Sequence, residues 1–369
     1  MKILITGANG FVGKNLIAEL RNQGFNDLLT FDVDTAYELL DTFTQECDFV
    51  FHLAGVNRPK EQSEFMTGNF GFTSLLLDKL KHNQNKAPVL ITSSTQAALD
   101  NPYGQSKKAG EDLIFAYGKE NNVQVFVYRL PNVFGKWCLP NYNSAVATFC
   151  HNIANDLPIQ VNDPNVSMIL VYIDDVITSF INKLKNGSDN DEAFESVEPL
   201  HTILLGDIVK LIEGFKESRK SLLLPDLGDA FTKKLYSTYL SYLPEDKFSY
   251  LLKMNVDARG SFTEFIKSTD RGQVSVNVSK PGITKGNHWH HTKNEKFLVV
   301  SGIGVIRFRK INTDITTEYF VSGDKLEVVD IPVGYTHNIE NLGQSDMVTV
   351  MWVNEVFDAA KPDTFFERV

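Results

Sequence analysis

The 369-residue sequence has few cysteines, no excess of basic residues and no long apolar run. Its three cysteines, Cys47, Cys138 and Cys150, form no close pair and are odd in number, which excludes a disulfide-stapled scaffold and favours a reducing compartment. A formal net charge of −10 argues against a broad nucleic-acid or acidic-membrane surface, since both need a basic face. No stretch approaches the ~20 apolar residues of a membrane span, and the apolar start is too short for a signal-peptide core. We therefore expect a cytoplasmic protein with neither nucleic-acid binding nor membrane insertion.

What is present is the composition of an ordinary globular protein, with 43% hydrophobic and 22% charged residues. The length allows two or three domains. Helical patterns alternate with apolar strands as far as Pro244, and short alternating strands follow Phe248. We expect an α/β domain with a doubly wound parallel sheet of the Rossmann type at residues 1–245, followed by an all-β domain at residues 246–369.

A glycine-rich turn follows the first predicted strand, residues 2–6, and leads into a helical pattern. The spacing of Gly7, Gly10 and Gly13 allows a tight turn, a close approach of the backbone to a pyrophosphate, and close packing of the helix on the strand. A glycine triplet alone is a weak signal, but its place between a strand and a helix predicts a dinucleotide site.

Asp32 ends the second predicted strand, near the offset at which a carboxylate hydrogen-bonds an adenosine ribose. Such a carboxylate favours NAD, because it repels a 2′-phosphate. Three further strands, with apolar character that fits a buried parallel sheet, are predicted at residues 48–55, 88–94 and 123–130.

A candidate catalytic group follows the fourth strand. Tyr103 and Lys107 are four residues apart at the start of a predicted helix, so both side chains lie on one face. A lysine beside a phenol would lower the phenol pKa and make the tyrosine a usable acid or base. Ser94, at the mouth of the strand, can orient the same substrate oxygen. Alone, the Tyr–Lys spacing would also fit an ordinary helix with a half-buried tyrosine and a solvated lysine.

Together these residues resemble the extended, nucleotide-sugar branch of the short-chain dehydrogenase/reductase family. The stretches HLAG (52–55), RLPNVFG (129–135) and VYIDDV (171–176) resemble the later motifs of that branch. The resemblance implies catalysis by Ser94, Tyr103 and Lys107. It implies cofactor contacts from Gly7, Asn9, Gly10, Phe11, Val12, Gly13, Asp32, Leu53, Ala54, Tyr103 and Lys107. It also implies substrate contacts from Arg129 and Asn132, with Asp174 nearby, although structural roles fit these residues equally well. The branch implies NADPH as the reductant, in conflict with Asp32, and leaves NADH open.

Two departures from this branch matter. Only eight residues separate Ser94 from Tyr103, so the intervening loop is short. Thr95 and Gln96 stand where a sugar 4,6-dehydratase would carry an acid pair, and without carboxylates there dehydration has no evident general acid and base. Reduction or epimerisation remains.

A candidate metal site lies in the second predicted domain. His288 and His290 are two apart on an extended segment, so both imidazoles face the same side. A hairpin would return Glu295 beside them, and His337 opens another strand. Three imidazoles and one carboxylate suit zinc, iron or manganese, and we expect zinc. A histidine-rich surface turn is the alternative.

These two stretches resemble the paired motifs of the cupin family, a small antiparallel barrel with a metal inside. Gly282, His288, His290, Glu295 and Gly302 fit the first motif, and Pro332, Gly334, His337 and Asn341 fit the second. His291, Lys296 and Tyr335 lie near the ligands in sequence and are candidates for proton transfer.

A reductase joined to a cupin barrel resembles the bifunctional enzymes of capsular-polysaccharide synthesis. That resemblance implies C3 epimerisation of a UDP-2-acetamido-2,6-dideoxy-4-keto-hexose in the barrel. Reduction of the C4 ketone would then give a UDP-N-acetyl-6-deoxy-L-talosamine, on the way to UDP-N-acetyl-L-fucosamine. It also favours a homodimer. Two alternatives stay open: a 4-epimerase that retains NAD and has a structural barrel, and a non-enzymatic protein that senses a cofactor. The metal could be catalytic or structural.

Overall fold

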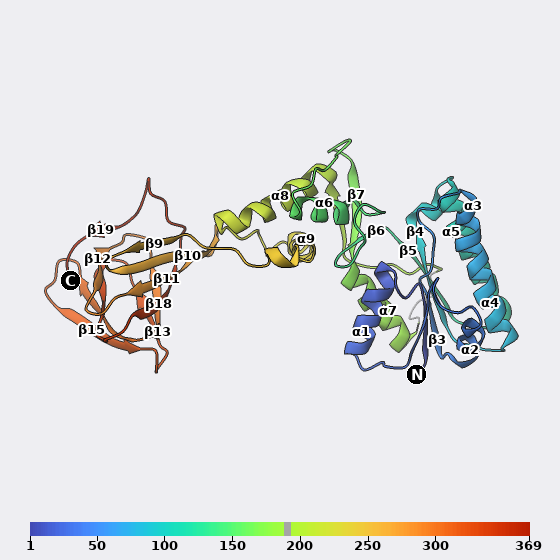
Figure 1. The fold of residues 1–369 in the computed structure, drawn as a ribbon, viewed down its shortest axis with the longest axis horizontal. Coiled ribbons are helices and arrows are strands. Elements are labelled where there is room, and N and C mark those ends of the chain that lie inside the picture. Colours follow the sequence, from blue (N-terminus) through green and yellow to red (C-terminus); the bar gives the residue numbers. More distant parts are fainter. Residues whose placement is uncertain (188–192) are drawn as a thin grey trace. The chain divides into compact units, whose positions relative to one another are not determined.

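The computed structural model describes residues 1–187 and 193–369, which form two compact units (Figure 1). The first unit comprises Met1–Glu213 and Asp229–Pro244, and the second comprises Gly214–Gly228 and Glu245–Val369. Within the described ranges, no helix is both long and apolar enough to cross a membrane.

The helices belong mainly to the first unit. They are α1 (Phe11–Asn22), α2 (Leu39–Glu46), α3 (Ser63–Phe65), the π-helix η1 (Met66–Gly71), α4 (Phe72–His82), the 3-10 helix η2 (Thr95–Ala98), α5 (Pro102–Asn121), α6 (Ala145–Ala154), α7 (Ile173–Asn186), α8 (Leu205–Ser221), α9 (Ala230–Leu240) and the 3-10 helix η3 (Glu245–Lys247).

The first unit is built on a parallel five-stranded sheet in the order β2-β1-β3-β4-β5. Its strands are β1 (Ile3–Thr6), β2 (Leu28–Phe31), β3 (Phe49–His52), β4 (Val89–Ser94) and β5 (Val125–Leu130). The order reverses between β1 and β3, and ligands of such sheets bind outside the carboxyl ends of the strands at this point. The predicted Rossmann-type sheet is confirmed.

Alternate side chains of each strand enter cores on opposite faces of this sheet. Ile3 and Ile5 pack with α1 and α7, whereas Leu4 packs with α2, α4 and α5. Figure 1 shows α1 and α7 on one side of the sheet and α2 and α4 on the other. Helices on both faces explain why the strands are apolar without alternation.

A smaller sheet completes the first unit and was not predicted from the sequence. It joins β6 (Asn132–Phe134), β7 (Ser167–Tyr172) and β8 (Leu200–Leu204) in the order β6-β7-β8. Leu235 and Tyr239 of α9 are buried in this unit.

The second unit is an antiparallel barrel of two sheets, as expected for a cupin-like fold. The six-stranded sheet has the order β16-β13-β18-β11-β10-β9, and the five-stranded sheet has the order β15-β14-β17-β12-β19. The strands are β9 (Met254–Asp257), β10 (Gly260–Ser268), β11 (Gly272–Ser279), β12 (Thr284–Trp289), β13 (Glu295–Ser301), β14 (Ile303–Lys310), β15 (Thr316–Ser322), β16 (Val328–Ile331), β17 (Tyr335–Asn341), β18 (Met347–Val353) and β19 (Phe365–Phe366).

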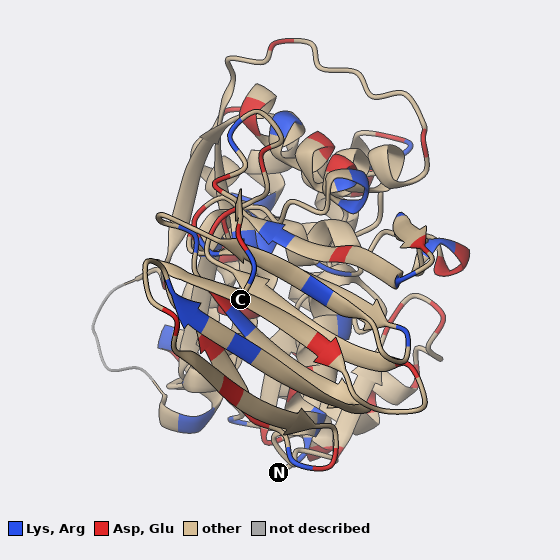
Figure 2. Ribbon diagram, turned by 90° about the vertical axis from the view of Figure 1, so that its left-hand side faces the viewer, with Lys and Arg blue, Asp and Glu red and all other residues tan. Residues whose placement is uncertain are grey.

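The outer surface of the five-stranded sheet is held by ion pairs. The guanidinium of Arg307 on β14 lies 2.7 Å from Glu318 of β15 and 2.5 Å from Glu340 of β17. Figure 2 shows basic and acidic positions interspersed on the barrel strands that face the viewer. Such cross-strand pairs each add a modest stabilisation and keep this face polar.

Candidate functional sites

The glycine-rich turn between β1 and α1 is closely packed by backbone. Gly7 has a φ of +70°, and a Cβ there would lie 2.7 Å from the amide nitrogen of Ala54. A Cβ at Gly13, in the first turn of α1, would lie 2.3 Å from the carbonyl oxygen of Gly7. Only glycine fits both positions, and the N-terminus of α1 is left open as a phosphate site.

Asp32 lies directly after β2, beside this turn. Its Oδ2 accepts a hydrogen bond from the backbone amide of Asn9 at 2.7 Å, and its Oδ1 accepts one from the amide of Val33 at 2.8 Å. A carboxylate oxygen has two lone pairs, so both oxygens can still accept a ribose hydroxyl. Asp32 thus holds the turn and presents negative charge beside it.

Ser94, Tyr103 and Lys107 come together at the carboxyl end of β4 and the start of α5. The Ser94 hydroxyl hydrogen-bonds the phenol of Tyr103. The ammonium of Lys107 lies 5.9 Å from the centre of the Tyr103 ring and donates to the carbonyl oxygen of Thr92 at 3.2 Å. The short loop after Ser94 forms η2, and the Ser94 hydroxyl accepts a hydrogen bond from the amide of Gln96 at 3.1 Å.

The protonation states in this group differ from the expectation. Burial raises the pKa of Tyr103, and the hydrogen bond from Ser94 only partly opposes this. The pKa lowering by Lys107 that we expected is absent, because Lys107 is directed to Thr92. Burial also lowers the pKa of Lys107 to about 8, although Glu111 acts in the opposite direction. The tyrosine is therefore neutral at physiological pH, which is the form that a proton donor needs.

A buried hydrogen-bond network that the sequence did not indicate supports this group. Asn69, in the π-helix η1, donates to the Ser106 hydroxyl at 2.9 Å and accepts from the Val56 amide at 2.8 Å. Ser106 in turn donates to the carbonyl oxygen of Tyr103. A Cβ on Gly55 would lie 2.9 Å from Lys107 Nζ and 3.0 Å from Asn69 Oδ1, so Gly55 leaves room for both. A π-helix is a common mark of functional positions, but its irregular turn has no clear sequence signal.

The network continues into the sheet through His52. Its Nδ1 lies 2.7 Å from Thr6 Oγ1 and its Nε2 lies 2.8 Å from Thr73 Oγ1. Burial, with a smaller contribution from Lys107, lowers the pKa of His52 to about 3, so the ring is neutral. We interpret His52 as a structural link between β1, β3 and α4.

The predicted substrate residues make structural contacts. Arg129 forms a two-pronged pair with buried Glu111, at 2.8 and 2.6 Å, and its guanidinium lies 3.8 Å from the centre of the Phe194 ring. Asn132 on β6 is exposed and donates to the carbonyl oxygen of Ile169 at 3.4 Å. The substrate contacts of Arg129 and Asn132 stay predictions.

Asp174 lies in the first turn of α7. It pairs with Lys136 at 2.5 Å, which ties the loop after β6 to this helix. Its nearness to a substrate, as the motif suggested, also stays a prediction.

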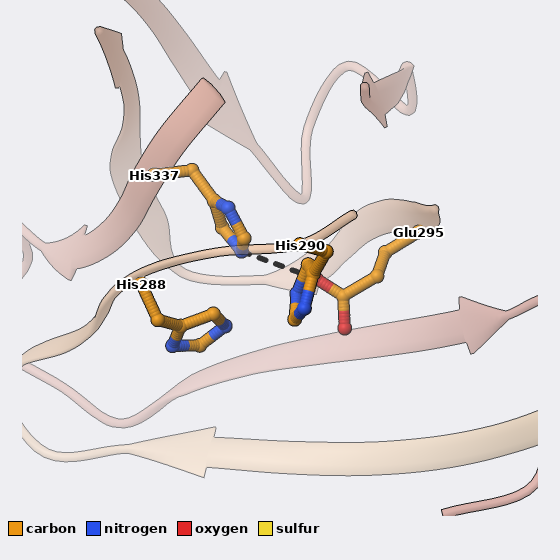
Figure 3. A group of neighbouring side chains, drawn as sticks. All are labelled: His288, His290, Glu295 and His337. Carbon is orange, nitrogen blue, oxygen red and sulfur yellow. Dashed lines mark ion pairs between the residues drawn. The ribbon is translucent and has the colours of Figure 1, made fainter. Parts of the chain in front are cut away.

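In the second unit, four side chains converge inside the barrel (Figure 3). His288 lies on β12 and His290 just after it, Glu295 begins β13, and His337 lies on β17 opposite His288. One ligand atom from each lies within 4.8 Å of the others. The four predicted metal ligands are thus brought together from three strands.

The polar atoms of this cluster fit a bound cation. Among the described residues, Nε2 of His290, Oε2 of Glu295 and both ring nitrogens of His337 are buried without a hydrogen-bond partner. Such atoms are costly unless a ligand satisfies them. Glu295 Oε2 lies 3.1 Å from His337 Nε2 and 3.6 Å from His290 Nε2. Burial lowers the pKa of His288 to about 4, which leaves a neutral imidazole able to ligate a metal.

Carbonyl groups orient two of the imidazoles. The Nδ1 of His290 lies 2.5 Å from the carbonyl oxygen of Asp363, and the ring of His288 hydrogen-bonds the backbone of Gly286. A carbonyl can only accept, so Nδ1 of His290 carries the proton and Nε2 keeps its lone pair. Supporting bonds of this kind are typical of metal-ligating histidines.

The cluster lines a cavity of about 960 Å³ inside the barrel. Its wall also carries several polar or charged residues: Asn255, Asp257, Arg259, Glu264, Gln273, Asn277, Lys285, Lys293 and Glu355. His291, Lys296 and Tyr335, the proton-transfer candidates from the sequence, are not among the residues that line it. Lys296 instead pairs with Asp330 on the outer surface. The volume suits a ligand larger than a single sugar ring.

Two protein-family models match separate parts of the chain. Residues 3–195 match the NAD dependent epimerase/dehydratase family, and residues 255–365 match the polysaccharide biosynthesis C-terminal domain. The first match covers the glycine-rich turn, Ser94, Tyr103 and Lys107, and the second covers the metal cluster.

Two relatives match the chain over nearly its whole length. A Pseudomonas aeruginosa protein named UDP-2-acetamido-2,6-beta-L-arabino-hexul-4-ose reductase is 47% identical over 365 residues, which are 99% of this chain and 98% of that protein. The crystal structure of the capsular polysaccharide assembling protein CapF from Staphylococcus aureus is 57% identical and covers 100% of both chains, with a TM-score of 0.95. A UDP-glucose 4-epimerase from Thermotoga maritima, at 18% identity, 66% of this chain, 98% of that one and a TM-score of 0.55, shares the fold. The chain belongs to the NAD dependent epimerase/dehydratase family and carries a polysaccharide-biosynthesis barrel after its nucleotide-binding unit.

Proposed function

We propose that the chain is a bifunctional nucleotide-sugar enzyme of capsular-polysaccharide synthesis. Its barrel, residues 246–369, epimerises C3 of a UDP-2-acetamido-2,6-dideoxy-4-keto-hexose. Its reductase domain, residues 1–245, then reduces the C4 ketone to a UDP-N-acetyl-6-deoxy-L-talosamine, a precursor of UDP-N-acetyl-L-fucosamine. The observation that carries the proposal is the presence, in one chain, of the Ser94–Tyr103–Lys107 group and of a four-ligand cluster facing a large cavity. The name of the Pseudomonas relative supports the 4-keto substrate.

In the reduction, a nicotinamide bound at the glycine-rich turn would supply the hydride to C4. Tyr103 donates its phenolic proton to the carbonyl oxygen, so that the ketone becomes an alcohol. Its raised pKa keeps this proton in place until the oxygen gains negative charge. The Ser94 hydroxyl orients the same oxygen, and Lys107 holds the nicotinamide ribose.

In the epimerisation, the hydrogen on C3 is acidic because it is next to the C4 ketone. His288, His290, Glu295 and His337 would hold a metal, which would supply Lewis acidity to polarise the ketone. The cavity beside the cluster can hold the sugar. It also offers amines and carboxylates, at Lys285, Glu264 and Glu355, that can take and return a proton. We propose zinc, which suits three imidazoles and one carboxylate.

The choice of nicotinamide separates two candidate functions. NADPH is the reductant proposed for a net reduction. Asp32 favours NAD and so supports a second candidate, a 4-epimerase that retains NAD and in which the barrel has only a structural role. Consumption of one NADPH for each sugar reduced excludes the second candidate. A protein that only senses a cofactor would consume no NADPH and convert no sugar.

We further propose that the chain forms homodimers in the cytoplasm. In the barrel, Val276, Val350, Leu298 and Val328 are paired side by side across β11, β18, β13 and β16, on the face opposite to the cavity. Val328 is exposed and the other three side chains are half-buried, and apolar patches at a protein surface can mark association surfaces. Light scattering should give twice the monomer mass, and Val350→Glu should reduce it to the monomer mass.

The first experiment follows the C3 proton of the UDP-linked 4-keto-6-deoxy-N-acetyl sugar by NMR in deuterated water, without nicotinamide. We expect C3 to exchange with solvent deuterium, and removal of metal by a chelator to stop the exchange. Added NADPH should then reduce the C3-epimerised ketone, so that its signal disappears. If C3 keeps its proton while NADPH is consumed, the barrel is not an epimerase and only the reductase proposal stands.

A further inference from the structure

The loop that begins at the candidate ligand His290 and leads to Glu295 has no strand partner for its amides. His290–Asn294 connects β12 to β13 and lies outside both sheets, yet His290 and Glu295 at its two ends must meet at one point. A metal demands ligand positions within a few tenths of an ångström. Something other than the sheet must therefore fix the loop.

The side chain of one distant residue, Asp363, binds most of these amides. Its Oδ1 accepts from the amide of His291 at 3.1 Å, and its Oδ2 accepts from the amides of Thr292 and Lys293, both at 2.9 Å. The Thr292 hydroxyl also donates to Oδ2, at 3.0 Å. Four donors of the loop thus converge on a single carboxylate.

The main chain of Asp363 contacts a metal ligand directly. Its carbonyl oxygen lies 2.5 Å from Nδ1 of His290. Lys293 Nζ donates to the preceding carbonyl, of Pro362, at 2.7 Å. Asp363 has a φ of +37°, which non-glycine residues seldom adopt. This backbone turns the carboxylate and the carbonyl toward the same loop.

We propose that Asp363 is a positioning residue of the metal site. It fixes residues 291–293 of the loop through its carboxylate and the His290 ring through its carbonyl, so that the His290 ligand atom is in place before a metal arrives. This inference rests on the proposed metal site in the barrel. It assigns to the C-terminal segment a role in metal affinity, although the segment contributes no ligand to the cluster.

The geometry requires a carboxylate and not merely a polar residue. An asparagine has one acceptor oxygen, and its amide nitrogen would place hydrogens against the loop amides. Asp363→Asn should therefore lose some of the hydrogen bonds from the loop amides without changing the shape of the side chain. Asp363→Ala should lose the whole carboxylate contribution and keep only the carbonyl.

The test is the zinc dissociation constant of the full-length protein, measured by competition with a colorimetric chelator. We expect Asp363→Ala to raise it by about 10- to 100-fold, the range for residues that orient metal ligands. We expect Asp363→Asn to raise it by less. Asp358→Asn is the matched control: it lies in the same segment and caps only the amide of Ala360, at 2.8 Å. It should change the constant by no more than about twofold.

Each outcome separates the inference from the proposed function. If the unaltered protein binds no zinc, both the proposed metal site and this inference are wrong. If the unaltered protein binds zinc and Asp363→Ala binds it equally well, only the inference fails. A purely structural role would lower the unfolding midpoint of the metal-free protein and leave the zinc constant unchanged. If Asp363→Ala does not fold, unchanged affinity in Asp363→Asn overturns the proposal.

Discussion

The two candidate sites differ in what satisfies their buried polar atoms. Around Tyr103, the chain closes its own hydrogen bonds, from Thr6 through His52 to Thr73 and from Asn69 to Ser106. In the barrel, the described ligand atoms of His290, Glu295 and His337 have no such partner. The hydrogen bonds of the first site are therefore closed within the chain, whereas the buried atoms of the second face one another, at 3.1 and 3.6 Å, in an arrangement that fits a bound cation. A substitution should remove chemistry at the first site, but change ligand binding and stability at the second.

The largest effect should come from Tyr103→Phe, which removes the proposed proton donor and keeps the ring. We expect the rate of NADPH-dependent reduction to fall by about 10²- to 10⁴-fold, while deuterium exchange at C3 continues unchanged. Tyr117→Phe removes the same atom from another buried tyrosine of α5 and should leave both rates intact. Equal loss of exchange and reduction in Tyr103→Phe would show that the two sites are not independent.

Next in size should be His337→Gln, which removes a ligand of the barrel cluster. We expect the zinc dissociation constant to rise by at least about 100-fold, beyond the cost of losing a supporting residue, and C3 exchange to stop. Zinc in excess should raise the unfolding temperature of the unaltered protein, because it binds only the folded state, but not that of the variant. His291→Gln is the control, since the ring of His291 packs against Trp289 and Phe365 outside the cluster. Zinc stabilisation that survives in His337→Gln would place the metal elsewhere.

A smaller, pH-dependent effect should distinguish the reductase site. Burial lowers the pKa of Lys107 from 10.5 to about 8, so its ammonium is lost as the pH rises through about 8. If this charge holds the nicotinamide ribose, kcat/KM for NADPH should fall about tenfold per pH unit above that value, while C3 exchange should not show this step. The exposed neighbour Lys108 pairs with Asp112, and Lys108→Met should keep the same profile. A flat profile from pH 7 to 10 would contradict a role for the charge.

The same shift has a consequence for stability, with a definite sign. Between pH 8 and 10.5 the unfolded chain binds the proton that folded Lys107 has released. The contribution of this group to the free energy of unfolding therefore rises with pH across that window and is constant below it. Lys107→Met should lack this rise in chemical unfolding at matched pH values.

Sequence reasoning located the features whose parts lie close together in the chain. The glycine triplet and the Tyr103–Lys107 pair each lie within one turn or helix, so their spacing predicts that their members lie together, although not that Lys107 is directed to Thr92. The four residues of the barrel cluster were also predicted, because two short motifs carry them, and the structure brings them together; their role as metal ligands stays a prediction. The sheet of the first unit followed from continuous apolar strands between helices.

Features that depend on distant contacts were not predictable. Asp363 and His290 are 73 residues apart, and nothing local to either marks the contact. Asn69 depends on an irregular π-helix. In β11, polar and valine positions alternate, and the sequence does not say which set faces inward. The structure buries Gln273, Ser275 and Asn277; Gln273 and Asn277 line the cavity, whose wall also includes Phe297 and Ile339 of the barrel's apolar core.

The smallest predicted effect concerns cofactor choice at Asp32. Asp32→Asn removes the negative charge beside the glycine-rich turn and keeps an oxygen that can accept from the Asn9 amide. We expect the ratio of kcat/KM for NADPH to that for NADH to rise by about tenfold, which corresponds to about 1.4 kcal/mol, because repulsion of a 2′-phosphate is relieved. Asp34→Asn is the matched control, since its carboxylate is exposed and meets only the side chain of Asn9, at 3.4 Å. C3 exchange in the barrel should be the same in all three proteins. An unchanged cofactor ratio in Asp32→Asn would mean that Asp32 serves the turn alone, so that its hydrogen bonds to the Asn9 and Val33 amides account for its place in the fold.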